Sequence, residues 1–387
     1  MGPRKYFLDW LRVLAFGGLI IFHVGMLYVT WSYNLKSPRL APGLEPLMEA
    51  LSAWRMALLF VISGVACRFL IERLGAWRFA GDRVVRLQPA ILTGMLLINP
   101  LQVWVQLRAQ GDTGLPYLSY WLRHYLLADS RYFAALGRPT PTWDHLWFLI
   151  YLFAYGLVFA AVFPPLRRLL RGEPPAWLLL LTPAAWMAAT NLLIHFVAPF
   201  THSFYDDWAA HVKWAGLFAA GAALASRSEV WEALAYRRRV LGLAAVALMA
   251  AYMALYTALP QGPPNPAWST AYQILGGVYG WVTILTVCGF AKRWLDRPSA
   301  TLTYLTDAVL PIYMLHQPVL LTTAWLLFPY ALPIPVEAML LAVATGVVPL
   351  GVYHLLIRPW PPVRALFGLR LRRREAASKH AFPKADA

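Results

Sequence analysis

The chain has 387 residues, of which 59% are hydrophobic and 13% are charged, and it carries a formal net charge of +16. Because an average soluble domain has about 25% charged residues, this composition excludes a soluble protein with an ordinary polar surface and predicts a membrane protein. The basic residues lie in short clusters between apolar stretches, which indicates membrane topology signals and argues against a nucleic-acid partner.

The N-terminal segment begins with a basic pair, Arg4 and Lys5, followed by apolar residues, as secretory signal peptides do. Asp9 and Arg12 interrupt the apolar run, however, and no small-residue cleavage site follows it. We therefore expect an uncleaved first transmembrane helix.

Ten apolar stretches are long enough to cross a bilayer, since a hydrocarbon core of roughly 30 Å needs about 20 residues of helix. They cover residues 8–30, 48–71, 84–106, 144–163, 176–198, 208–226, 240–259, 268–291, 301–328 and 335–357. We predict an all-α polytopic membrane protein of about ten transmembrane helices. Its membrane-embedded domain would span residues 1–363, and residues 364–387 would form a basic, disordered cytoplasmic tail.

The distribution of basic residues predicts the orientation of the chain. With the N-terminus in the cytoplasm, 26 of the 34 Lys and Arg residues fall on the cytoplasmic side. Since basic loops stay in the cytoplasm, we predict that both termini are cytoplasmic and that the protein lies in the inner (plasma) membrane. Most histidines fall instead on the outer half, namely His23, His124, His145, His195, His202, His211 and His316. They predict a polar outer cavity, although scattered interfacial histidines would give the same asymmetry.

The first predicted helix carries ionisable residues on one face. Arg12 and His23 are eleven residues apart, which corresponds to a rise of about 16 Å and to about three turns. Asp9 lies on nearly the same stripe. Ionisable groups within a span usually face the interior of a helix bundle or a water-filled cavity, because their transfer into lipid is costly. The pattern predicts an inward-facing stripe, with Arg12 near the cytoplasmic mouth and His23 beyond the midplane.

Two interpretations of this stripe remain open. In the first, Arg12 binds a phosphate-bearing donor that enters from the cytoplasm, and His23 acts as a general base. In the second, Arg12 extends to the lipid phosphates and His23 bonds a neighbouring helix. The second interpretation does not require the two side chains to share a face, so the shared face favours the first.

Five segments resemble the acyltransferase-3 family of membrane acyltransferases, and the resemblance runs over most of residues 4–360. The first is LDWLRVLAF followed by FHVGM, in which Arg12 and His23 match the family's Arg, ten residues, His arrangement. The others, in family order, are RMALLFVISGVACRFL, DRVVRLQPAILTGMLLINPLQ, HLWFLIYLFAY and LPIYMLHQPVLL. They are most similar to the branch of glucans-biosynthesis succinyltransferases.

The resemblance implies an O-acyltransferase that moves an acetyl or succinyl group to a hydroxyl of a carbohydrate on the outer side. The donor would be acyl-CoA from the cytoplasm, used as a co-substrate, with no tightly bound cofactor. His23 would be the base, or would accept the acyl group transiently. Arg12 would bind the donor phosphates or orient the thioester, and Arg83 and Arg86 could add to this acyl-CoA site unless they are only topology charges.

Three further residues are candidates for acid/base chemistry or oxyanion stabilisation. Arg55 lies several residues inside its helix and could bind a carboxylate of the acyl group or an oxyanion, or extend to the headgroups. His145 could be a second acid/base, a sugar contact or an interfacial hydrogen-bond donor. His316, with Tyr313 one turn before it, could be functional or could simply join two helices.

The segment from Thr201 to Asp207 combines aromatic and acidic residues on the outer side, which suits sugar stacking and hydroxyl binding as well as it suits a solvated loop. Its candidate acceptor-binding residues are His202, Tyr205, Asp206 and Asp207. Lys213 and Asp307 have no assigned role, and we expect a buried ion pair between them or with Arg55. No Cys/His spacing typical of a metal site occurs in the sequence, and oligomeric state is not indicated.

The alternative function is a membrane transporter or flippase, in which Arg12 and His23 line a permeation or proton pathway. Transporter folds commonly contain inverted repeats with helices broken at matching positions. No such symmetry relates residues 1–200 to residues 201–387, which favours the enzyme.

Overall fold

The computed structural model describes residues 5–169, 175–258 and 265–370, and within these ranges the regular structure is helical, without strands. The long elements are α1 Tyr6–Met26, α2 Glu45–Leu74, α3 Ala76–Thr93, α4 Asn99–Gln110, α7 Trp147–Leu169, α8 Ala176–Phe196, α9 Trp208–Leu224, α10 Ser228–Thr257, α11 Pro266–Leu295, α12 Ala300–Leu327 and α13 Ile334–Val352. The short elements are α5 Tyr117–Tyr120, α6 Phe133–Leu136 and α14 Pro361–Leu366.

Nine membrane-spanning segments in the described ranges are long and apolar enough to cross a bilayer, which confirms the prediction of an all-α polytopic membrane protein. The predicted span 208–226 corresponds to α9, which has 17 residues and packs against α2 and α8. A length of about 17 residues is the lower limit for a crossing helix. The fold is therefore that of an integral membrane protein.

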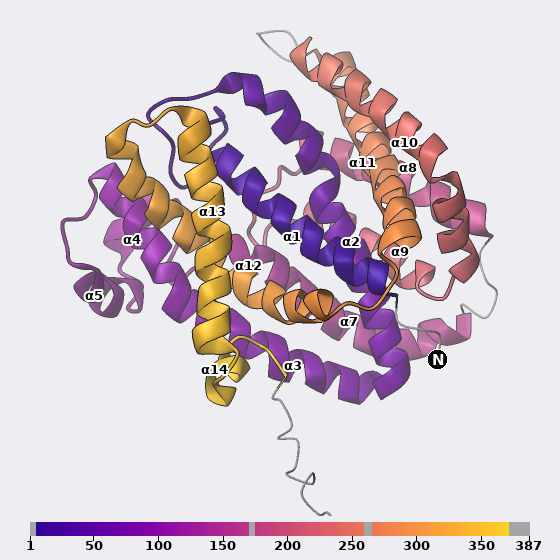
Figure 1. Cartoon of the computed structure of the whole chain (residues 1–387), viewed down its shortest axis with the longest axis horizontal. Helices are drawn as coiled ribbons and strands as arrows, with labels where there is room; N and C mark the ends of the chain where they lie inside the picture. Colours follow the sequence, from indigo (N-terminus) through magenta and orange to yellow (C-terminus); the bar gives the residue numbers. More distant parts are fainter. Residues whose placement is uncertain (1–4, 170–174, 259–264, 371–387) are drawn as a thin grey trace, which may run out of the picture.

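Helix α1 runs through the middle of the bundle and contacts α2, α11, α12 and α13 (Figure 1). Helices α10 and α11 lie on one side of it, and α4 and α13 lie on the other. We refer below to the two ends of the bundle as the Arg12 end and the His23 end, after the residues near the two ends of α1. His23, Arg55 and His316 of the candidate site come from this central helix and from two of the helices that contact it.

The close packing of α2 and α9 depends on two glycines. A Cβ atom on Gly64 would collide with the backbone carbonyl of Phe218, and one on Gly221 would collide with the carbonyl of Val61. The two helix backbones therefore touch directly, as small residues permit in membrane bundles.

The predicted span 84–106 is not one regular helix, because a π-helical turn over residues 94–98 separates α3 from α4. Pro100 lacks a backbone N–H, so the carbonyl of Leu96 has no partner within the helix. The indole Nε1 of Trp121 donates to that carbonyl at 2.8 Å. The segment that follows α4 thus packs back onto the helix that precedes it.

The first helix is shorter than predicted, since α1 ends at Met26 and not at residue 30. The chain then turns into a loop over residues 27–41, which we call the 27–41 loop. Lys36 Nζ donates to the carbonyl of Met26 at 2.6 Å and satisfies a carbonyl that the helix end leaves free. Ser37 N donates to the carbonyl of Leu27 at 2.9 Å.

A buried carboxylate holds the same loop on α13. Glu337 has no exposed surface, and its Oε2 lies 3.2 Å from Arg39 Nη2, while its Oε1 accepts from the Tyr28 hydroxyl at 2.9 Å. Arg39 also donates to the carbonyl of Leu332. The loop is therefore tied to α13 and to the turn that precedes it, and not only to its own ends.

Residues 364–370 of the predicted tail pack against the bundle. Arg364 lies in α14, is 3% exposed, and forms an ion pair with Asp307 at 3.0 Å. The expectation that Asp307 pairs with Lys213 or Arg55 is therefore wrong. The remainder of the predicted tail, residues 371–387, lies outside the described residues.

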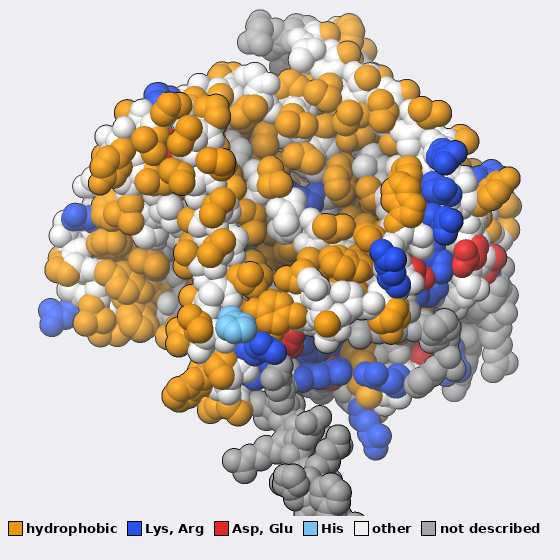
Figure 2. Space-filling model, viewed as in Figure 1, with side chains coloured by type: hydrophobic (Ala, Val, Ile, Leu, Met, Phe, Trp, Pro, Cys, Tyr) orange, Lys and Arg blue, Asp and Glu red, His pale blue; other side chains and the backbone are white. Residues whose placement is uncertain are grey.

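Basic side chains collect at the Arg12 end. Figure 2 shows Lys and Arg along the lower edge of the molecule, over α3, with hydrophobic side chains covering most of the rest of this face. This end includes Arg83 and Arg86 of α3 and Arg364 of α14. Its charge is what a cytoplasmic face would carry under the positive-inside rule.

Candidate active site

Three imidazole rings meet near the end of α1. His316 of α12 lies between the other two, with ring centroids 5.2 Å from His23 and 5.2 Å from His145. His145 and His316 are 7% and 1% exposed. The sequence predicted all three as candidates, and the fold brings them together.

A proline in α12 positions one of these rings. Pro318 has no backbone N–H, so the carbonyl of Met314, four residues earlier, lacks its helical partner. His145 Nε2 donates to that carbonyl at 3.1 Å, which leaves Nδ1 of His145 as the acceptor nitrogen. His316 Nδ1 donates to the carbonyl of Tyr313 at 2.6 Å, which leaves Nε2 as its acceptor. Neither acceptor nitrogen has a hydrogen-bond partner among the described residues.

Arg55 supplies a buried positive charge beside the histidines. Its side chain is 6% exposed, and neither Nε nor Nη1 has a hydrogen-bond partner in the described part of the chain. The guanidinium carbon lies 3.7 Å from the centre of the Phe22 ring, so a cation–π contact replaces part of its lost hydration. A buried charge without an anionic partner is costly. This guanidinium is therefore poised to bind an anion.

A tyrosine from the 27–41 loop orients His23. The Tyr33 hydroxyl lies 3.0 Å from His23 Nδ1, and the two rings stack with centroids 5.7 Å apart. Burial, together with the negative charge of Asp144, raises the pKa of Tyr33 well above its ordinary value. The hydroxyl therefore stays neutral at physiological pH. Because it occupies Nδ1 of His23, the nitrogen that remains available to a substrate is Nε2.

The same loop places Asn34 in a polar network that sequence reasoning missed. Asn34 Nδ2 lies 3.1 Å from Gln106 Oε1 and 3.4 Å from Asp144 Oδ2, and Gln317 Nε2 donates to Asn34 Oδ1 at 3.3 Å. Arg138 pairs with Asp144 at 2.7 Å. No spacing rule connects a loop residue to three other elements, although a Tyr-Asn pair so soon after the His23 helix is a signal.

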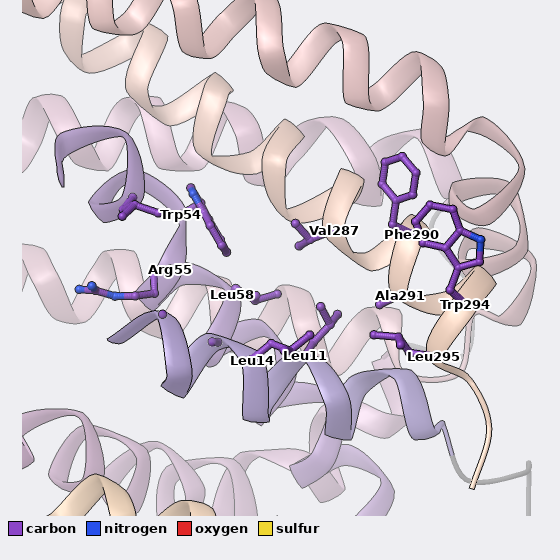
Figure 3. A pocket seen from close by; sticks show the side chains of 13 residues that line it. Leu11, Leu14, Trp54, Arg55, Leu58, Val287, Phe290, Ala291, Trp294 and Leu295 are labelled. Carbon is purple, nitrogen blue, oxygen red and sulfur yellow. The ribbon is translucent and has the colours of Figure 1, made fainter. Parts of the chain in front are cut away.

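An apolar groove of about 300 Å³ leads to Arg55 from the Arg12 end. It lies between α1, α2 and α11, and Figure 3 shows Arg55 at one end of it and Trp294 and Leu295 at the other. The other side chains of its lining include Leu11, Leu14, Trp54, Leu58, Val287 and Phe290. The groove is large enough for an extended chain of a small ligand.

The predicted donor-binding arginines lie at the opposite end from the histidines. Arg12 pairs with Asp9 at 3.6 Å, with about a quarter of its side chain exposed. Arg83 pairs with Asp82 at 2.5 Å, and Arg86 Nε donates to the carbonyl of Gly368 at 3.1 Å. Their separation from His23 agrees with a site that extends across the bundle.

The predicted acceptor segment forms a loop whose carboxylates already have partners. Asp207 is 3% exposed and accepts from Tyr151 at 3.0 Å and from the Thr201 backbone N–H at 2.7 Å. Asp206 accepts from Ser203 at 2.8 Å. Tyr205 is 81% exposed.

His202 of the same loop is packed on aromatic rings. Its ring centroid lies 4.0 Å from Phe200 and 5.5 Å from Trp147. Burial lowers the pKa of His202. His202 nevertheless keeps an exposed surface, through which it could contact an acceptor.

The comparisons with known proteins identify the family. A family model described as an acyltransferase domain matches residues 5–354. The chain is 26% identical over 340 residues to glucans biosynthesis protein C of Salmonella gallinarum, with 82% of this chain and 83% of the relative covered. It is 29% identical over 203 residues to the protein of the same name from Salmonella heidelberg, covering 50% and 47%.

No solved structure matches. The match to the family model covers most of the chain, includes both Arg12 and His23, and extends over the elements that supply His145 and His316. The chain therefore belongs to the acyltransferase-3 family of integral-membrane acyltransferases.

Proposed function

We propose that this acyltransferase moves an acyl group, acetyl or succinyl, from cytoplasmic acyl-CoA to a hydroxyl of a carbohydrate outside the inner membrane. The observation that carries the proposal is a cluster of three imidazole rings together with a buried Arg55 guanidinium whose Nε and Nη1 have no hydrogen-bond partner in the described part of the chain. Acyl transfer needs both a base for the acceptor hydroxyl and a positive charge for the oxyanion. The glucan in the names of the relatives favours a carbohydrate acceptor.

The basic Arg12 end suits the CoA phosphates, because guanidinium groups bind phosphate with two parallel hydrogen bonds. From there the groove between α1, α2 and α11 would take the apolar part of the donor and bring the thioester toward Arg55. Under this proposal the Arg12 end is cytoplasmic and the His23 end faces outward. The positive charge at the Arg12 end supports that direction.

The chemistry follows from these positions. His23 Nε2 accepts the proton of the acceptor hydroxyl as its oxygen attacks the thioester carbonyl. Arg55 stabilises the tetrahedral oxyanion, which collapses with cleavage of the carbon–sulfur bond. The CoA thiolate leaves and receives the proton from the imidazolium, so the products are an oxygen ester and CoA thiol. His316 packs its ring against His23, and backbone carbonyls of α12 hold both His316 and His145 in place.

The test uses the full-length protein in proteoliposomes with labelled acyl-CoA inside and oligosaccharide acceptor outside. The wild type should form a labelled oxygen ester, and His23→Ala should lower the rate by about two to four orders of magnitude. His354→Ala is a matched control, because His354 is exposed, bonds Tyr304 and lies away from both the three rings and the acceptor side. Label that appears outside as unreacted donor, with no ester formed, would contradict the proposal and support transport instead.

A further inference from the structure

A second cavity of about 370 Å³ lies on the other side of α2 from the groove. It is polar, and its lining includes Glu49, Asn191, Lys213, Tyr252, Gln273 and Phe200. We call it the Lys213 cavity. None of the residues proposed for acyl transfer lines it, so it needs a separate explanation.

Opposite charges face this cavity from different helices without pairing to each other. Lys213 Nζ of α9 donates to Asn191 Oδ1 at 2.7 Å, and Asn191 Nδ2 donates to the carbonyl of Gln273 at 3.1 Å. Glu49 of α2 accepts at 2.9 Å from Tyr252 and at 2.5 Å from Tyr272. The cavity therefore offers donors from Lys213 on one wall and the Glu49 acceptor on another.

The position of the cavity relates it to the transfer site. Glu49 lies in the early turns of α2 and Lys213 in those of α9, and both helices begin at the His23 end. Phe200 lines the cavity and contacts His202, so the loop predicted to bind the acceptor forms part of the cavity rim. The cavity thus opens on the side from which an extracytoplasmic acceptor would come.

Aromatic side chains separate the cavity from the histidines. Phe200 contacts Trp147 with ring centroids 5.2 Å apart, and Trp147 contacts Phe148 at 6.5 Å. Phe148 in turn contacts Tyr313 at 6.2 Å, beside His316. A ligand in the cavity would therefore be separated from the histidines by this row of aromatic rings.

We propose that the Lys213 cavity binds a saccharide unit of the acceptor other than the one that is acylated. This inference rests on the proposed function. A sugar ring presents hydroxyls that accept from an ammonium group and donate to a carboxylate, and it presents an apolar face to aromatic rings such as Phe200. A cavity of a few hundred Å³ suits a ligand of this size. Glu49 and Lys213 thus set specificity for acceptors longer than one sugar.

The experiment measures binding and catalysis separately in nanodiscs that contain the full-length protein. The binding probe is a panel of glucose trisaccharides with different linkages, followed by isothermal calorimetry. Glu49→Gln and Lys213→Met should each weaken trisaccharide binding about ten- to a hundred-fold, since each removes a charged hydrogen bond. Glu72→Gln and Lys292→Met, at the Arg12 end, are matched controls that should bind as the wild type does.

Two further readouts separate this inference from the proposed function. His23→Ala should bind trisaccharide normally but form no ester, and the cavity variants should raise the acceptor KM while acyl-CoA hydrolysis without acceptor stays unchanged. If the wild type binds no trisaccharide, or if the cavity variants bind it as well as the wild type, the inference is overturned even where ester forms. Loss of a bound phospholipid from the variants, with trisaccharide binding unchanged, would also overturn it and would identify a lipid site.

Discussion

At the scale of single residues, Arg55 has the surroundings that are hardest to explain by stability. A buried guanidinium without an anionic partner lowers the stability of a protein, and its replacement by an apolar side chain of similar length is often neutral or stabilising. The Phe22 ring compensates for only part of the lost hydration. The position of Arg55 at the end of the groove therefore points to a role in binding or chemistry.

Arg55→Met should lower the rate of ester formation by about two to three orders of magnitude, because it removes the positive charge proposed for the oxyanion. Thermal unfolding in detergent should occur at the same temperature as in the wild type or higher. Arg68→Met is the matched control on the same helix, since Arg68 pairs with Glu72 at the Arg12 end. An active Arg55→Met protein would rule out this role for the guanidinium.

Under the proposed mechanism Tyr33 would be a positioning residue, because it would act on the reaction through His23. Tyr33→Phe keeps the stacked ring but removes the hydrogen bond to His23 Nδ1. We expect kcat to fall about ten-fold, the equivalent of one hydrogen bond, while the donor KM stays unchanged. Tyr330→Phe, at a residue that is 73% exposed, should leave both constants unchanged. Equal losses in the two variants would argue against a specific contact with His23.

At the scale of elements, Pro318 links α12 to the site, because it leaves one backbone carbonyl of this helix without a helical hydrogen bond. Pro318→Ala restores a backbone N–H that can bond to the carbonyl of Met314, and His145 then loses its acceptor. We expect lower activity with no loss of thermal stability, measured on the same preparation. Pro349→Ala, in α13, repeats the substitution at a buried helical proline away from the histidines and should keep full activity. A Pro318→Ala enzyme with normal kcat would show that His145 needs no such anchor.

The 27–41 loop depends on Glu337. Glu337→Ala leaves the Tyr28 hydroxyl and Arg39 without their carboxylate, and we expect the free energy of unfolding to fall by about 1–3 kcal/mol. Activity should fall as well, because the loop carries Tyr33. Glu72→Ala, which removes an exposed carboxylate, should change the stability by less than about 0.5 kcal/mol. A proteolysis assay of the loop would measure the local effect directly.

Helix positions could be predicted from apolar length, since the bilayer imposes one dominant constraint on every span. The stripe of Arg12 and His23 followed from the helical period alone. The π turn over residues 94–98 and the early end of α1 could not be predicted this way, because they depend on Trp121 and Lys36, which are distant in sequence or outside the helix. Tyr33 was missed for the same reason.

At the scale of the whole molecule, the orientation of the bundle decides the direction of transfer. Single cysteines at exposed positions test it, because the native Cys67 and Cys288 are buried. Tyr330→Cys, at the His23 end, should react with a membrane-impermeant maleimide in intact cells. Trp77→Cys, which replaces a 92% exposed side chain at the Arg12 end, should react only after permeabilisation. The reverse pattern would contradict a cytoplasmic N-terminus.

The direct contact between α2 and α9 at Gly64 and Gly221 has a consequence for selectivity. The two backbones touch at these glycines, and we expect this contact to limit sliding of the helices and to keep Glu49 on α2 and Lys213 on α9 at a nearly constant separation. A ligand that spans the gap between Glu49 and Lys213 would meet two charges already in place, so its binding would not pay the entropy cost of ordering them. One that is a single group too short reaches only one of the two charges. The protein would then select ligands by their length. A larger residue at either glycine would push the two helices apart and change the length that binds best.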